Sequence, residues 1–521
     1  MNKDLLIKFN SFSFSVICIS VLISLYSFWF FLDNKIYLIG SDAFAYISIA
    51  DSILENGEMR DNTTIPSSPI KSPQNGIAFV HVILSILGIS AKGRILIIVF
   101  INYLLYLSGI FPLYKIARIS GLKMGLPLIV LLSAYLGAWH IYRINLLAIN
   151  DGIFNSIILW LVYLIIKFAQ FTDQSKFNSH LILDLKRIIG IILIVMVLIH
   201  FRLNVILVIG SAFLSAMIVR KYNVAAWFLT VCLLLVISLF AVYMFMEVSK
   251  FGETSRLEGN FLMHVYFYPL FTSITNIYNI KFQLWNVLPR LVSGLSGLTN
   301  PLATLLFTIF PLSMIYYGIK GIMERNFNKV FIASICLSGL WFTMTFKNAR
   351  VIWYTFPFIY LIILSLKRVQ YVGYVFVLLV FVQSLQLFYI GYWRGPDSKL
   401  FLHIYENNIS IPLVDPLLLT HRSRHSYFHL NTRSYRVADD DDGTLDGHIT
   451  FPKGLNWDLI HERGSLFVLG DSTYINSSYN QVQEMASSDG YVLKLNPITP
   501  KFDEFKGWAL VEFQITEDDP L

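Results

Sequence analysis

Charged side chains stand beside long apolar segments at a few points of this sequence. Asp42 follows the first apolar segment, Asp151 opens a later one, and Lys347 and Arg350 precede another. A carboxylate can take the proton of a hydroxyl group as that hydroxyl attacks a substrate. A guanidinium can hold a phosphate through two charge-assisted hydrogen bonds. Residues of these types could therefore serve a transfer reaction with a hydroxyl nucleophile and a phosphate leaving group.

Asp42 lies in the sharpest local pattern, Gly40-Ser41-Asp42-Ala43-Phe44-Ala45-Tyr46. In a helix, Asp42, Tyr46 and Ala50 share one face, because residues four apart are neighbours. We predict that Asp42 is a general base and that Tyr46 binds substrate. The alternative is that Ser41 or Asp42 caps this helix, or that the carboxylate is only solvated.

A second acidic residue, Asp151, begins an apolar segment. It could orient the acceptor, pair with Arg143 earlier in the chain, or cap its helix. His140, Arg143 and Arg202 stand at outer ends of apolar segments, so we predict them, with Asp151, as substrate-binding residues. For each basic residue taken singly, structural pairing or lipid contact is the alternative.

The stretch from Lys347 to Pro357 combines two basic residues with several aromatic ones. We predict that Lys347 and Arg350 bind a phosphate and that Tyr354 contributes to substrate binding. The alternative is that the basic side chains reach to lipid headgroups, as such residues often do beside a membrane segment. Their place on the outer side, against the charge bias of the other connectors, favours binding.

The composition indicates a protein whose main solvent is lipid. Of the 521 residues, 55% are hydrophobic and 14% are charged, whereas soluble domains have about 25% charged residues. The apolar runs approach the ~20 residues that cross a ~30 Å hydrocarbon core. We therefore predict an all-α polytopic membrane protein with about eleven transmembrane helices, at 11–32, 95–114, 124–140, 152–169, 188–200, 203–219, 224–245, 300–318, 330–346, 351–366 and 371–391.

Lysine and arginine gather in alternate connectors, for example at Arg220–Lys221 and Lys367–Arg368, and this pattern sets the orientation. The basic connectors belong inside, which places the N-terminus in the cytoplasm. An odd number of spans then places the C-terminus outside. The same distribution explains the net charge of +7, so we predict no nucleic-acid partner.

Two domains are expected. Residues 1–391 form a transmembrane domain, which contains a long first outer loop at 33–94 and a second, lid-like outer loop at 246–299. From residue 392 onward the sequence is polar, with short alternating runs such as Leu466–Gly470 and Leu510–Ile515. We predict that 392–521 is a small extracytoplasmic soluble domain, β-rich or α+β.

Taken in order along the chain, several of these motifs resemble those of a known enzyme family. The order Asp42-x-x-x-Tyr46, Gly57, a turn containing Pro66, Pro69 and Pro73, and an apolar stretch ending in Leu87-Gly88 resembles the first outer loop of GT-C-fold glycosyltransferases of the protein mannosyltransferase and aminoarabinose transferase type. Asn150-Asp151-Gly152 looks like the acidic start of that family's fourth span. The Lys347–Pro357 stretch looks like its late Arg-aromatic-Pro stretch.

The resemblance implies an inverting glycosyltransferase of a bacterial inner (plasma) membrane. The donor would be a polyprenyl-phosphate-linked sugar and the acceptor a glycan, a lipid or a protein, with membrane lipid around the enzyme. Many members have two adjacent acids in the first loop, whereas Asp42 is followed by Ala43. A divalent ion usually needs several oxygen ligands. We therefore predict no cofactor and a metal-independent reaction, although the sequence leaves a divalent cation open.

Two other functions remain as alternatives. One is a polysaccharide polymerase or ligase that uses lipid-linked glycans, although the acidic first loop favours the transferase. The other is a transporter, for which inverted repeats and broken helices would be expected. The Asp439–Asp442 run lacks the spacing of an EF-hand loop, and Gly470-Asp471-Ser472 lacks the G-x-S-x-G pattern, so we interpret both as turns.

Overall fold

The computed structural model of the chain describes residues 11–38, 41–65, 67–69, 76–123, 125–137, 148–174, 181–202, 204–248, 301–346, 354–375, 396–411, 416–420, 422–435, 455–499 and 508–517. The chain divides into two compact units. Unit 1 is Met1–Leu32, Lys71–Ile77 and Lys92–Ile390, and unit 2 is Asp33–Ile70, Ala78–Ala91 and Gly391–Leu521. Nearly all of the predicted lid-like loop, 246–299, lies outside the described residues.

Unit 1 is built from apolar helices. A backbone surrounded by lipid must satisfy its hydrogen bonds within the segment, and uninterrupted runs of Leu, Ile, Val and Phe do so as helices. The described helices are α1 (Ser11–Asp33), α4 (Ala91–Ser108), α5 (Ile110–Ile119), α6 (Leu126–Gly137), α8 (Asn150–Gln174), α9 (Leu181–Phe201), α10 (Val205–Ile218), α11 (Tyr222–Val248), α15 (Pro301–Met323), α16 (Phe327–Phe346) and α17 (Phe356–Ser365).

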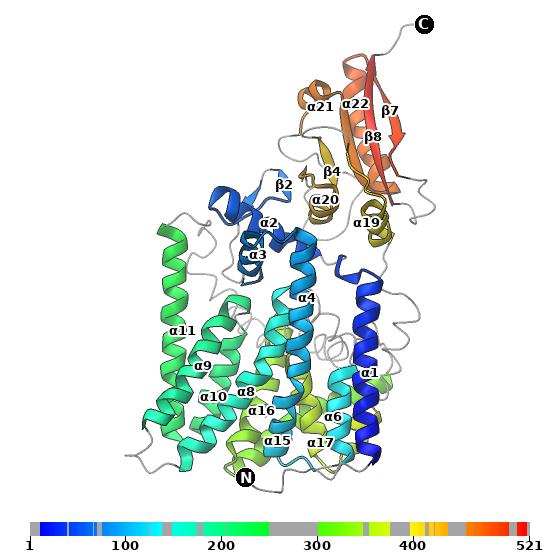
Figure 1. The fold of residues 1–521 in the computed structure, drawn as a ribbon. Helices are drawn as coiled ribbons and strands as arrows, with labels where there is room; N and C mark the ends of the chain where they lie inside the picture. Colours follow the sequence, from blue (N-terminus) through cyan, green and yellow to red (C-terminus); the bar gives the residue numbers. More distant parts are fainter. Residues whose placement is uncertain are drawn as a thin grey trace. The chain divides into compact units, whose positions relative to one another are not determined.

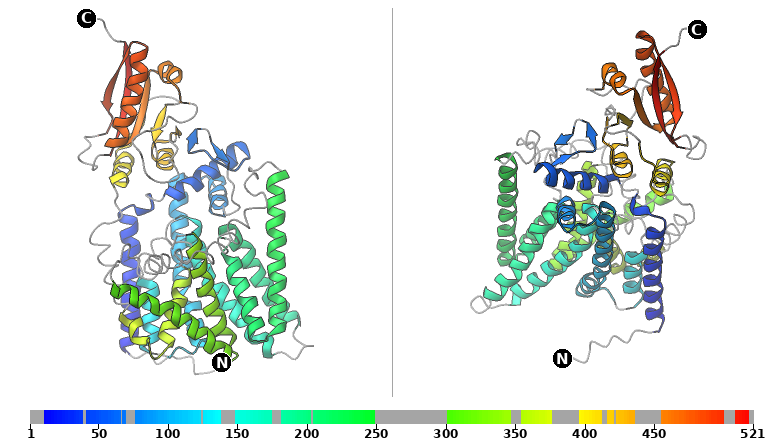
Figure 2. Two further views of the ribbon diagram at one scale, coloured as in Figure 1. Left: turned by 180° about the vertical axis from the view of Figure 1, so that it is seen from behind. Right: turned by 45° about the horizontal axis from the view of Figure 1, so that its top comes forward.

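The helices of unit 1 pack side by side, with α8 against α9, α10 against α11 and α16, and α15 against α16 (Figure 2). Small residues permit this close packing. The hydroxyl oxygens of Ser211 in α10 and Ser338 in α16 lie 3.3 Å apart, within hydrogen-bond distance. A side chain at Gly321 of α15 would meet the backbone of α16, since its Cβ would lie 2.9 Å from the Val330 nitrogen. These contacts make the bundle a packed helical core.

Large apolar side chains of unit 1 also point outward. Leu22, Leu193, Ile237 and Leu312 are each more than 60% exposed, on α1, α9, α11 and α15 respectively. Lipid is as apolar as these side chains, so a membrane-embedded surface tolerates them. Among the described residues, two helices are long and apolar enough to cross a membrane, Ala91–Ile119 and Asn150–Thr172. The predicted total of about eleven spans stays a prediction.

One described helix is longer than the membrane span predicted within it. The charges at Lys186 and Arg187 led to a short span at 188–200, but α9 runs through them and begins at Leu181. Lys and Arg are good helix formers, so a charge that ends a membrane segment need not end the helix. In contrast, the start of α8 at Asn150 confirms the helix predicted after Asn150-Asp151-Gly152.

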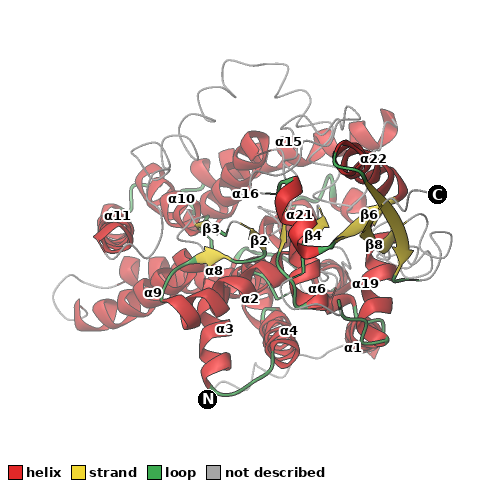
Figure 3. Cartoon of the chain, turned by 90° about the horizontal axis from the view of Figure 1, so that it is seen from above, coloured by secondary structure: helices red, strands yellow, loops and turns green. Residues whose placement is uncertain are grey.

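Unit 2 holds all the described strands (Figure 3). Its main sheet has six strands in the order β2-β5-β4-β6-β8-β7. The first four run parallel, and β8 and β7 are antiparallel to their neighbours. The strands are β2 (Thr64–Ile65), β4 (Leu418–Thr420), β5 (Ser434–Tyr435), β6 (Ser465–Asp471), β7 (Tyr491–Pro497) and β8 (Trp508–Glu517), and a separate hairpin pairs β1 (Arg60–Asp61) with β3 (Ser68–Pro69).

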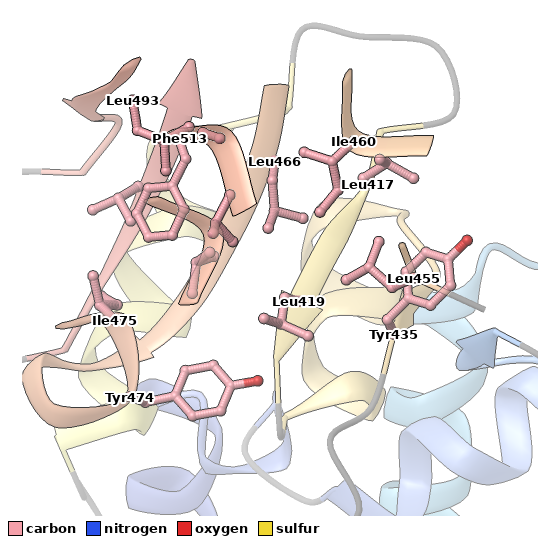
Figure 4. Packing of buried hydrophobic residues seen from close by; sticks show 14 of the residues in the cluster. Leu417, Leu419, Tyr435, Leu455, Ile460, Leu466, Tyr474, Ile475, Leu493 and Phe513 are labelled. Carbon is pink, nitrogen blue, oxygen red and sulfur yellow. The ribbon is translucent and has the colours of Figure 1, made fainter. Parts of the chain in front are cut away.

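Helices cover both faces of this sheet, as the run of buried residues in β6 requires. Leu466 and Val468 belong to a core with α21 (Trp457–Arg463) and α22 (Ser472–Ser488), shown in Figure 4. Phe467 and Leu469 belong to a second core with α19 (Pro396–Glu406) and α20 (Ser423–Leu430). Successive strand residues point to opposite faces, which produces the two cores. The predicted small sheet in the C-terminal segment is therefore confirmed.

The first outer loop contributes to the same unit. It forms α2 (Ser41–Asn56), the hairpin β1–β3 and strand β2, and it leads into α3 (Gly76–Ile86). Strand β2 pairs with β5, and the Ser434 amide donates to the Thr63 carbonyl at 3.2 Å. Figure 1 shows α2 and β2 in blue beside α20 in gold. Loop and C-terminal segment thus share one sheet, although the sequence suggested separate domains.

Candidate functional site

Asp42 lies in the first turn of α2, as the sequence predicts. The helix buries Ala43, Phe44 and Ile47 completely or nearly so. The Asp42 side chain lies on the remaining face and is 31% exposed. The apolar face of α2 therefore fixes the helix, and the carboxylate stays accessible to a substrate.

Arg424 of α20 contacts Asp42 across unit 2. Its Nη1 lies 3.1 Å from Asp42 Oδ1, within hydrogen-bond distance. Its Nε lies 3.7 Å from Oδ2 of Asp61, the last residue of β1. One guanidinium thus stands between two carboxylates, and the three charges sum to minus one. The arginine side chain is 39% exposed, so the cluster faces solvent.

Asp61 is fixed by several hydrogen bonds. Its Oδ1 accepts from the Thr63 amide at 3.1 Å, the Thr63 hydroxyl at 2.7 Å and the Ser48 hydroxyl at 3.2 Å. Ser48 of α2 also accepts from the Asn62 amide at 2.7 Å. The chain can return onto α2 here because Gly57, with φ +67°, ends the helix in the left-handed region that favours glycine. A local turn therefore carries a second acid back to Asp42.

Aromatic rings hold α2 against α20. Phe44 stacks on Phe428 with ring centroids 4.3 Å apart, and it makes edge contacts with His425 and His429 at 5.3 and 5.4 Å. Phe401 of α19 stacks on both histidines from the other side. These contacts bury apolar area, which is the main source of packing stability.

Two titratable groups of this packing have shifted pKa values. Burial lowers the pKa of His429 to about 3, with a further lowering from His425 and a partial opposing effect of the Leu38 carbonyl. Burial raises the pKa of the Tyr427 hydroxyl, as do the carboxylates of Asp51 and Glu55. That hydroxyl donates to Asp51 at 3.3 Å. His429 is therefore neutral, and Tyr427 is protonated, at neutral pH.

Unit 1 contains a second charged pair. Asp151, in the first turn of α8, is 2% exposed. Its Oδ2 lies 2.6 Å from Nη2 of Arg202. The neighbouring Asn150 accepts from the Ile77 amide at 3.1 Å. The sequence suggested Arg143 as one possible partner of Asp151, but Arg143 lies outside the described residues. Among the described residues, Arg202, which follows α9, forms an ion pair with Asp151. Burying a carboxylate beside a guanidinium in this way offsets the cost of removing each charge from water.

Of the other predicted site residues, Tyr46 and Tyr354 lie among the described residues. Tyr46 lies one turn after Asp42 in α2 and is half-buried. Tyr354 precedes α17, is 1% exposed and makes an edge contact with Phe154 of α8. The others lie outside the described residues, namely His140, Arg143, Lys347 and Arg350.

The described residues contain no group of three or more His, Cys, Asp or Glu side chains that could hold a metal ion. Two carboxylates do come together at Asp42 and Asp61, but a guanidinium lies between them. The metal-independent reaction stays a prediction, to be tested by chelation.

Sequence reasoning missed Arg424 and Asp61. Arg424 lies within a polar, histidine-rich stretch, Thr420–Tyr427, that has no apolar period to mark its inner face. Asp61 follows Gly57 by four residues, and a glycine that ends a helix is a recognisable sign that the chain turns back. That sign could have suggested Asp61, whereas nothing local could have suggested Arg424.

Comparisons with known proteins support the fold. No protein-family model and no curated protein matches the chain. The crystal structure of an oligosaccharyltransferase from Archaeoglobus fulgidus, in the apo form, matches with TM-score 0.50 and 12% identity over 92% of this chain and 71% of that one. That of ArnT from Cupriavidus metallidurans, in the apo state, gives TM-score 0.44 and 14% identity over 96% and 98%. The chain shares the fold of the oligosaccharyltransferase, which confirms the GT-C-like architecture.

Proposed function

We propose that this chain is a polytopic membrane glycosyltransferase that moves a sugar from a polyprenyl-phosphate-linked donor to a hydroxyl of a glycan, a lipid or a protein. The observation that carries the proposal is the accessible Asp42 carboxylate, held by Arg424 on a GT-C-like scaffold. An alcohol is a poor nucleophile, and a positioned carboxylate can take its proton during attack.

Asp42 acts as the general base in this reaction. The acceptor oxygen forms a bond to the anomeric carbon while the bond from that carbon to the phosphate oxygen breaks. The acceptor's proton passes to Asp42, and the polyprenyl phosphate leaves with the electron pair. A single displacement of this kind inverts the anomeric configuration.

The donor phosphate needs positive charge where its negative charge develops. Lys347 and Arg350 are the proposed donors of that charge. Arg202 is a third, because its Nε is buried and has no hydrogen-bond partner among the described residues, while its Nη2 is held by Asp151. An oxygen of the donor would satisfy this nitrogen. Asp151 then orients Arg202, and Tyr46 and Tyr354, with His140 and Arg143, complete the proposed substrate contacts.

The proposed enzyme crosses a bacterial inner membrane with about eleven helices, with the N-terminus in the cytoplasm and unit 2 on the outer face. The exposed apolar side chains of α1, α9, α11 and α15 support lipid as the surroundings of unit 1. Polyprenyl phosphates are membrane lipids, so donor and enzyme would meet in the bilayer.

The test replaces Asp42 by Asn in cells from which the chain has been removed. Lipid-linked and surface glycans are compared by mass spectrometry after complementation with wild type, Asp42→Asn, or the matched control Asp458→Asn, which changes an exposed carboxylate of α21. We expect wild type and the control to restore the glycan mass, and Asp42→Asn to leave at most about one hundredth of the transfer rate.

Restoration at the wild-type rate by a folded Asp42→Asn protein would contradict the proposal. Folding is verified by the melting temperature of the purified variant. In the same assay, transfer is expected to persist in EDTA. Loss of transfer that Mn²⁺ or Mg²⁺ restores would show instead that a metal ion takes part.

A further inference from the structure

The ion pair between Asp42 and Arg424 contributes little to holding α2 and α20 together. The side chains are 31% and 39% exposed, and exposed ion pairs stabilise a protein only weakly because water screens the two charges. The two helices are already joined by the buried Phe44 and its stack on Phe428. A structural role alone therefore does not account for this arginine.

The guanidinium occupies a specific place between the two carboxylates. Its Nη1 faces Asp42 at 3.1 Å and its Nε faces Asp61 at 3.7 Å. Asp61 is in turn fixed by Thr63 and Ser48 through three hydrogen bonds. The ion pair with the fixed Asp61 carboxylate keeps the guanidinium in place, and the hydrogen bond from Nη1 at 3.1 Å orients the Asp42 carboxylate. Asp61 thus anchors Arg424, and Arg424 orients Asp42.

The positive charge has a second consequence. A cation within hydrogen-bond distance of a carboxylate favours the ionised form of that carboxylate, and Arg424 stands in this position beside Asp42. An ionised carboxylate is the form that accepts a proton. The arginine would therefore help to keep Asp42 in the ionised, reactive state.

We propose that Arg424 is a positioning residue for Asp42, so that the C-terminal segment supplies part of the machinery of the reaction rather than only a separate binding domain. This inference rests on the proposed function of Asp42. Arg424 acts through the carboxylate and is not itself assigned a contact with substrate. Asp61 is the anchor that sets the direction of the guanidinium.

The experiment compares wild type, Arg424→Ala and Arg424→Lys in the full chain. Tyr427→Phe is the matched control, because it lies on the same helix and removes only the hydroxyl that donates to Asp51. Membrane vesicles containing each variant are supplied with a dilution series of a total lipid extract from cells lacking the chain as donor. Product glycan is quantified by mass spectrometry between pH 4.5 and 8.5.

For Arg424→Ala we expect kcat to fall about 10- to 100-fold with KM changed less than about twofold, since misplacement of a catalytic group affects the chemical step. The acid limb of the pH–rate profile should move up by about one pH unit, because Asp42 loses its neighbouring positive charge. Arg424→Lys should keep the acid limb near that of wild type but lose part of kcat, since lysine lacks the planar fork. Tyr427→Phe should match wild type in both respects.

An unchanged acid limb in a folded Arg424→Ala protein would overturn the inference, and so would equal losses in Arg424→Ala and Tyr427→Phe. If Arg424→Ala fails to fold, Arg424→Gln removes the charge with a smaller change of shape and is subject to the same criterion. If the proposed function of Asp42 is wrong, the result is a different one, because Asp42→Asn would then transfer sugar at the wild-type rate regardless of the results for the Arg424 variants.

Discussion

At the scale of single residues, the histidines of α20 are the clearest case of chemistry altered by packing. His429 lies among Phe44, Phe401 and Tyr405, with ring centroids 5.3 to 6.0 Å away. Its Nδ1 is buried and has no hydrogen-bond partner in the part of the chain that the structure describes, and its Nε2 lies 3.3 Å from the Leu38 carbonyl oxygen. Burial disfavours the charged imidazolium, and the neighbouring His425 adds to this effect, so the pKa of His429 is lowered to about 3.

The stability of unit 2 should therefore depend on pH through His429. The unfolded imidazole takes up a proton below its ordinary pKa of about 6.5, while the folded one does not until about pH 3. Folding stability is thus fully present above pH 6.5 and falls by up to about 1.4 kcal/mol per pH unit below it. We expect the melting temperature of wild type to drop between pH 7 and 5 by more than that of His429→Phe.

His425 faces the same cluster and remains in both proteins, so the difference between the two proteins isolates His429. The measurement is thermal unfolding of the purified full chain in detergent. Parallel melting curves for wild type and His429→Phe across this pH range would show that His429 is not held neutral in the folded state.

At the scale of elements, the connection from β6 to α22 shows how a suggestive motif becomes a helix cap. Asp471 is the N-cap of α22, and its side chain accepts from the Tyr474 amide at 2.9 Å. The preceding position is occupied by Gly470, where a larger residue would not fit, because its Cβ would lie 2.5 Å from the Tyr474 ring. The Gly470-Asp471-Ser472 sequence is thus explained by local geometry, as its interpretation as a turn expects.

Removing this cap should destabilise α22 without affecting catalysis. We expect Asp471→Ala to cost about 1 kcal/mol of stability, since an N-cap side chain satisfies an otherwise unpaired helix amide. Asp471→Ser should cost less, because serine also caps. The check is the melting temperature of both variants together with their transfer rates. A stable Asp471→Ala protein with impaired transfer would instead indicate that this carboxylate takes part in the reaction.

At the scale of the whole molecule, the shared sheet constrains the membrane topology. Strand β2 comes from the first outer loop, and its partner β5 comes from the C-terminal segment. Two strands in one sheet must lie on the same side of the membrane. In the proposed membrane protein, the chain between Ala91 and Gly391 would therefore cross the membrane an even number of times, as would the ten spans predicted after the first outer loop.

This constraint predicts a labelling pattern. Single cysteines at Glu55 and Ser487, both exposed in unit 2, should react with a membrane-impermeant maleimide added outside intact cells. A cysteine at Glu324, in the exposed connector between α15 and α16, should react only after the membrane is permeabilised. The unmodified chain is labelled in parallel, so that the signal from its native cysteines can be subtracted. Labelling of Glu55→Cys and Ser487→Cys from opposite sides would contradict the shared sheet.

Local properties of the sequence were enough to predict the helices of unit 1, the strands β6 and β8, and the place of Asp42 on an amphipathic helix. Run length, apolar period and glycine positions are determined by residues within a few turns of one another. Helix ends were predicted less accurately from these local properties, because α9 begins at Leu181, before the charged residues that were used to place the start of the span.

The tertiary structure alone decided the partners: Arg424 beside Asp42, Arg202 beside Asp151, and β2 beside β5. These pairs join residues that are far apart in the chain. The periodicity of a sequence reflects local neighbours and does not predict which distant side chain will lie beside a given residue. An exposed carboxylate can accept any cation that the packing brings to it. The choice is made by the apolar contacts that seat α20 against α2, because burial of those rings has the larger free energy.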